Sequence, residues 1–179
     1  YQVKHSFENV LISVAKDEKE YSIYVINDLL KDLIGNIELS IINFNGKTTW
    51  SKNDKINVSS NSSQNILKLN HEILKGTSPQ ESFLRIEFES NGKKYSRNYF
   101  IEIPKNLALT QPSFSVKKIN DNEFEISSNV LAKDVYLLDN DNQFDDNFFD
   151  LIPNEKRIIK ANQPIKNLKV LSLYDTMKK

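Results

Sequence analysis

The stretch SFLRIEFESNGKKYSRNYFI, residues 82–101, decides the fold class of this chain. In its first half apolar residues alternate with charged ones: Leu84, Ile86 and Phe88 with Arg85, Glu87 and Glu89. Strict alternation is typical of a β-strand with one buried face. The Asn91-Gly92 pair that follows readily adopts the positive φ angles of a two-residue hairpin turn. We therefore predict that residues 82–90 pair in antiparallel fashion with residues 93–101.

The same period of two residues extends over most of the chain, and β-branched residues are common. Helical patterns are confined to short turns at residues 29–33 and 71–74. The predicted strands cover residues 10–14, 21–27, 36–44, 48–58, 65–69, 83–90 and 95–103, and then 114–118, 123–127, 134–138, 156–160 and 168–174. This pattern predicts an all-β chain made of two tandem immunoglobulin-like β-sandwiches.

A domain boundary is predicted between Pro104 and Pro112. Residues 105–111 lack alternation, and Pro112 cannot donate a hydrogen bond within a central sheet. The first sandwich is therefore assigned to residues 7–103, a linker to residues 104–112, and a smaller sandwich to residues 113–179. A domain as small as the second buries a limited core, so we expect it to depend on its neighbour for stability.

The composition argues against several classes of function. The 24 Lys and Arg residues balance the 24 Asp and Glu residues, so nothing favours nucleic acid or a membrane surface as a partner. No apolar run approaches the roughly 20 residues of a membrane span. The chain has no cysteine, which rules out disulfides and thiolate sites and leaves the compartment open.

Two neighbouring motifs carry a resemblance to a known family. They are LAKDVYLL at residues 131–138 and FDDNFFDLIPNE at residues 144–155. Together they resemble the last immunoglobulin-like domain of family 2 glycoside hydrolases of the β-mannosidase type. The chain departs from the family pattern at Asn154, where glycine is usual. Asparagine also tolerates a left-handed backbone, so we expect this turn to be kept.

Weaker matches occur in the right order elsewhere. YVIND at residues 24–28, and NYF at residues 98–100 followed by Pro104-Lys105, are similar to segments of the preceding domain of that family. Residues 1–13 look like the family's passage out of its catalytic barrel, with residues 1–6 as the stub of the last barrel helix.

The resemblance implies a non-catalytic C-terminal accessory region that packs on the catalytic (β/α)₈ barrel of the same polypeptide and stabilises it. The whole enzyme would then hydrolyse terminal β-mannosides. Both catalytic glutamates of the family belong to the barrel, so we assign no catalytic residue and no cofactor to this chain.

An acidic cluster follows residue 138 and admits two interpretations. Its members are Asp139, Asp141, Asp145, Asp146 and Asp150. Their spacing partly follows a calcium-binding EF-hand loop, but Phe144 stands where that loop needs glycine. The other interpretation, which we adopt with no metal assigned, is a structural corner. Its residues are Asp146, Asn147, Phe148, Phe149, Asp150 and Pro153, with polar side chains capping turn amides around a buried Phe148-Phe149 pair.

Trp50 is the candidate for contact with carbohydrate, because an exposed indole can stack on a pyranose ring. Packing in the core is the competing role. A carbohydrate-binding module is accordingly the first alternative function, with Tyr21, Tyr24 or Tyr95 joining Trp50 to hold an oligosaccharide. A spacer or adhesin-like pair of sandwiches with no sugar role is the second. Fold alone does not separate these functions.

Overall fold

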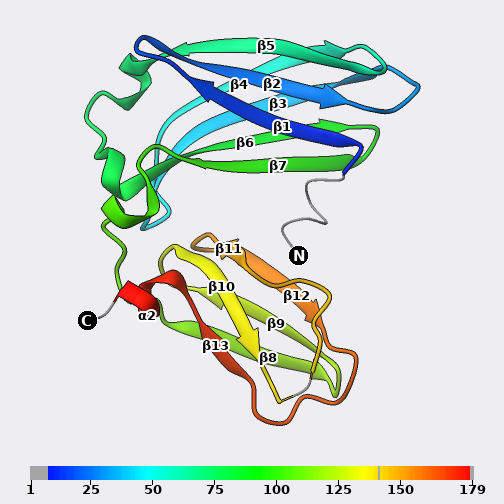
Figure 1. The fold of residues 1–179 in the computed structure, drawn as a ribbon, viewed down its shortest axis with the longest axis vertical. Helices are drawn as coiled ribbons and strands as arrows, with labels where there is room; N and C mark the ends of the chain where they lie inside the picture. The colour runs from blue at the N-terminus through cyan, green and yellow to red at the C-terminus, as the bar shows by residue number, and fades with distance from the viewer. Residues whose placement is uncertain (1–7, 141, 178–179) are drawn as a thin grey trace. The chain divides into compact units, whose positions relative to one another are not determined.

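The computed structural model describes residues 8–140 and 142–177, which divide into two compact units (Figure 1). The first unit holds the described residues up to Leu107 except residues 44–46, and the second holds residues 44–46 and those from Ala108 on. The predicted helix stub at residues 1–6 lies outside the described residues.

The first unit is a sandwich of two antiparallel sheets (Figure 1). One sheet has the order β1-β2-β5 and consists of β1 (Val10–Lys16), β2 (Glu20–Asn27) and β5 (Ser62–Asn70). The other has the order β4-β3-β6-β7 and consists of β4 (Thr48–Val58), β3 (Leu33–Asn43), β6 (Ser82–Ser90) and β7 (Lys93–Phe100). Short 3₁₀ turns cover His71–Leu74, Pro79–Glu81 and Pro104–Asn106.

The hairpin that decides the fold class forms as predicted. Strands β6 and β7 pair in antiparallel register, with Glu87 opposite Ser96. Asn91 and Gly92 have φ angles of 52° and 72°, as a two-residue turn with a left-handed backbone requires. The inward residues of β6, Leu84, Ile86 and Phe88, are buried in the core of this sandwich.

Asn27, the asparagine of the YVIND motif, is fully buried and ties three segments together. Its side-chain amide donates to the carbonyl oxygens of Lys31 at 2.9 Å and Ser59 at 3.0 Å, and more weakly to that of Val58 at 3.3 Å. Its own oxygen accepts the Leu29 N–H at 3.1 Å. Buried carbonyl groups need such partners, so the motif has a structural explanation.

The second unit is a smaller sandwich with its own core (Figure 1). One sheet, in the order β12-β9-β8, consists of β8 (Phe114–Asn120), β9 (Glu123–Ser128) and β12 (Lys156–Lys160). The other, in the order β11-β10-β13, consists of β10 (Ala132–Leu138), β11 (Phe149–Leu151) and β13 (Lys169–Leu171). The predicted all-β class with two immunoglobulin-like sandwiches is therefore confirmed.

The chain departs from the predicted elements near its C-terminal end. The strand expected over residues 168–174 ends at Leu171, and the short helix α2 (Leu173–Met177) follows. Ser172 precedes this helix, and its N–H and hydroxyl both donate to the Asp175 carboxylate, at 2.8 and 3.1 Å. Both bonds run from Ser172 to Asp175, and they satisfy the Ser172 N–H and hydroxyl at the start of the helix. Within residues 8–140 and 142–177, no helix has the length and apolarity needed to cross a bilayer.

Candidate functional site

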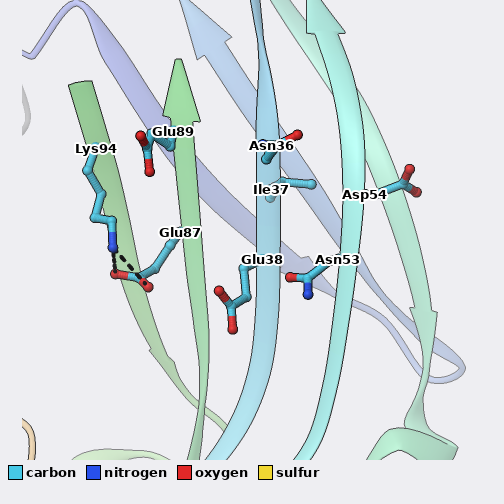
Figure 2. A pocket seen from close by; sticks show the side chains of 8 residues that line it. All are labelled: Asn36, Ile37, Glu38, Asn53, Asp54, Glu87, Glu89 and Lys94. Carbon is cyan, nitrogen blue, oxygen red and sulfur yellow. Dashed lines mark hydrogen bonds and ion pairs between the residues drawn. The ribbon is translucent and has the colours of Figure 1, made fainter. Parts of the chain in front are cut away.

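A hollow of about 530 Å³ lies on the sheet β4-β3-β6-β7 (Figure 2). Its lining residues are Asn36, Ile37, Glu38, Asn53, Asp54, Glu87, Glu89 and Lys94. Ile37 is fully buried and lies directly opposite Asp54, so both residues are on the face of the sheet that is turned toward the core. The outward wall is polar, with three glutamates, two asparagines and one lysine, and none of the lining residues is aromatic.

Glu87 is the best-anchored carboxylate of this hollow. It accepts a hydrogen bond from the Arg85 guanidinium at 2.9 Å. The Lys94 ammonium lies 3.4 Å from the same oxygen (Figure 2). Glu38 stands directly opposite Glu87 on the neighbouring strand. The two cations offset the repulsion expected between facing carboxylates. The hollow can hydrogen-bond polar groups, but its exposed position on a sheet gives no enclosed reaction site.

None of the site residues predicted from sequence lines this hollow. The sequence did carry a signal for it, since Glu38, Glu87 and Glu89 are among the outward residues in the alternation of β3 and β6. Outward charged residues are usual on a solvated sheet face, so the pattern alone did not single them out.

The predicted corner is organised around Asn147, which is 6% exposed. The Leu137 N–H donates to the Asn147 side-chain oxygen at 2.8 Å, and the Asn147 amide donates back to the Leu137 carbonyl at 3.1 Å. One side chain thus satisfies both backbone groups of Leu137, as a neighbouring strand would.

The charged members of the corner are also engaged. Asp146 accepts the Asn147 N–H at 2.8 Å and forms an ion pair with Arg157. Asp150 accepts the Asp134 N–H at 3.2 Å and lies 3.6 Å from the Lys133 ammonium.

The two phenylalanines of the corner differ in burial. Phe149 is buried, but Phe148, which was expected to be buried beside it, is 46% exposed. Phe148 precedes β11 and has a left-handed φ of 58°, so its ring does not follow Phe149 into the core. Pro153 is buried, and Asn154 has a φ of 69°, which confirms the left-handed turn.

The described aspartates of the calcium interpretation bind backbone N–H groups. Asp139 is buried and accepts the backbone N–H groups of Lys166 and Asn167, at 3.0 and 2.5 Å. Asp145 accepts the Lys160 N–H at 2.9 Å, and Asp141 lies outside the described residues. Among the residues that the structure describes, no group of three or more His, Cys, Asp or Glu side chains could hold a metal ion.

The hydrogen bonds to Asp139 also affect its ionisation. The Lys166 N–H in first place, then the Asn167 N–H and the Asn142 amide, lower the pKa of this carboxyl below its ordinary value against the opposing effect of burial. A carboxyl with a lowered pKa stabilises the fold above its unfolded-state pKa, and this stabilisation is lost as the pH falls through the lowered value.

Trp50 is partly buried and packs against the core of the first sandwich. It pairs across the sheet with Ile41, which belongs to the inward register. Tyr21 is buried, with its ring 4.7 Å from that of His71, and Tyr95 stacks on Phe88. Sugar contact by Trp50 stays a prediction.

The fold and these surfaces define a tandem pair of immunoglobulin-like sandwiches. A family model described as a Mannosidase Ig/CBM-like domain matches residues 19–106, and a second, described as an Ig-fold domain, matches residues 109–176. With these two matches and the structural match to a β-mannosidase described next, the chain belongs to the immunoglobulin-like accessory domains of mannosidase-type glycoside hydrolases.

Solved structures give the same picture. A β-D-mannosidase from Dictyoglomus thermophilum is 26% identical, with a TM-score of 0.78, and the match covers 96% of this chain and 22% of that one. The exo-chitosanase CsxA from Amycolatopsis orientalis, at 12% identity and a TM-score of 0.56 over 96% of this chain and 27% of that one, shares the fold alone. No curated protein matches the sequence.

Proposed function

We propose that this region packs on the catalytic domain of its own polypeptide and stabilises it, in an enzyme that hydrolyses terminal β-mannosides. The observation that carries the proposal is the match to the Dictyoglomus β-D-mannosidase. Nearly all of this chain aligns, yet it accounts for 22% of that enzyme, so most of that enzyme lies outside the match. Interfaces between domains of one chain bury about 600–1,500 Å², and a large apolar one would hold this region on the catalytic domain and stabilise both.

The site geometry supports a role without catalysis. A retaining glycosidase needs an acid/base carboxyl and a nucleophilic carboxylate about 5–5.5 Å apart, flanking the scissile bond. Glu38 and Glu87 face each other, but Glu87 is already bound by Arg85 and Lys94. The hollow also offers no aromatic surface to place a sugar ring against these carboxylates.

We expect the purified chain to show no turnover of an aryl β-mannoside above the buffer rate. The measurement is release of p-nitrophenol from p-nitrophenyl β-D-mannopyranoside, with the double variant Glu38→Gln/Glu87→Gln as the matched control. Activity that follows the protein through a second column, and that the double variant lacks, would overturn the non-catalytic assignment.

A further inference from the structure

Two aromatic rings lie together on the outer face of the sheet β11-β10-β13. The rings of Tyr136 and Phe148 stack with centroids 5.0 Å apart and planes 24° from parallel. Phe148 is 46% exposed, and Tyr136 is partly exposed. Strand β10 carries Tyr136, and Phe148 immediately precedes the neighbouring β11 (Figure 1). The pair therefore forms a stepped aromatic surface on the second sandwich.

The backbone of Phe148 is unfavourable for the residue it carries. Its φ is 58°, a left-handed conformation that is an outlier for a bulky side chain. Its N–H donates to the Val135 carbonyl at 2.8 Å and to the Asn147 side chain at 3.2 Å, which holds this conformation in place. Glycine or asparagine would suit the position better. The left-handed backbone therefore costs stability at this position, and strain of this kind clusters at binding sites.

Charged groups border the aromatic pair. Asp150 lies between the buried Phe149 and Leu151 in β11, so the alternation of the strand places it on the outer face of the sheet. Asp150 accepts the Asp134 N–H, and the Lys133 ammonium lies 3.1 Å from Asp134. On the other side of Tyr136, Leu171 is directly opposite in β13 and 42% exposed. The surface combines flat apolar area with carboxylate and ammonium groups held at its edge.

We propose that Tyr136 and Phe148 form a platform that binds a pyranose ring of a neutral oligosaccharide. The C–H face of a pyranose stacks on aromatic rings, while its hydroxyl groups need hydrogen-bonding partners at the rim. Asp134 and Asp150 supply acceptors, and Lys133 supplies a donor. This proposal is independent of whether the region packs on a catalytic domain. Only the choice of β-1,4-mannotriose as the first probe rests on the proposed function.

The test is a titration of the ¹⁵N-labelled chain by two-dimensional NMR, with β-1,4-mannotriose and β-1,4-cellotriose as separate probes. We expect saturable shifts centred on residues 133–137 and 147–150 with at least one probe. Phe148→Gly should weaken this binding at least tenfold while leaving the melting temperature unchanged or raised, because glycine relieves the left-handed backbone. Ile158→Ala, which removes an exposed side chain from β12 in the same sandwich, should bind as the parent does.

Three results would overturn the platform. They are the absence of shifts with both probes, binding that Phe148→Gly leaves intact, and shifts centred on Trp50 instead. A melting temperature that falls sharply in Phe148→Gly would also count against it, since the ring would then serve the fold. None of these results bears on whether the region stabilises a catalytic domain, so the two proposals fail separately.

Discussion

Gly35→Ala should destabilise the first sandwich by about 3 kcal/mol or more, as expected for severe overpacking at a rigid site. Gly35 lies in β3 opposite Ser90 of β6. A Cβ at this position would stand 2.0 Å from the Glu89 carbonyl oxygen and 2.9 Å from the Phe88 ring. The obstacle is backbone, which cannot rotate away, so the two central strands must separate.

Gly76→Ala is the matched control for that substitution. Gly76 has a φ of 78°, and an added Cβ would meet nothing within 4 Å. Only the left-handed backbone penalises alanine there, by about 1–2 kcal/mol. Urea denaturation of both variants gives the comparison. A loss in Gly35→Ala no larger than that in Gly76→Ala would contradict the close approach of β3 and β6.

Phe149→Ala should cost the second sandwich about 3–5 kcal/mol, the usual range for emptying a buried aromatic site. The ring belongs to the core formed with Phe124, Val135 and Leu137. The Arg157 guanidinium also lies over it, 4.4 Å from the ring centroid. The substitution would remove this cation–π contact and would also leave a cavity where the ring was. A domain this small has little stability in reserve.

The adjacent Phe148→Ala variant provides the control for Phe149→Ala, because it removes an equal number of atoms one residue away. Its ring is exposed, so the expected loss is below about 1 kcal/mol. Thermal unfolding of the two variants measures the difference. A larger loss in Phe148→Ala than in Phe149→Ala would reverse the assignment of the two rings to surface and core.

Much of the fold could be predicted because period-two alternation is a direct consequence of one-sided burial. The hairpin at residues 82–101 is the clearest case, since both the strands and the turn pair Asn91-Gly92 carry independent signals. Strand β11 was missed because its residues, Phe149–Leu151, are too few to show a period. The start of α2 had a usable signal, the Ser172-x-x-Asp175 spacing of a capped helix.

The candidate surfaces were less predictable. The sequence indicated a corner at residues 146–153 but not that Asn147 would replace a strand partner for Leu137, because that contact joins residues ten positions apart. The Tyr136–Phe148 stack depends on the left-handed φ of Phe148. Phenylalanine rarely adopts this conformation, so the sequence offers no reason to expect it. Cross-strand proximity, as between Glu38 and Glu87, likewise follows from register alone.

Whether the region stabilises a catalytic domain in cis is tested most directly on the parent enzyme with and without residues 1–179. The measurement is the half-life of β-mannosidase activity at a temperature just below the melting point of the intact enzyme. We expect the truncated enzyme to lose activity several-fold faster, and adding the separate chain in excess to restore part of the half-life. An unchanged half-life after truncation would contradict the stabilising role and favour a spacer.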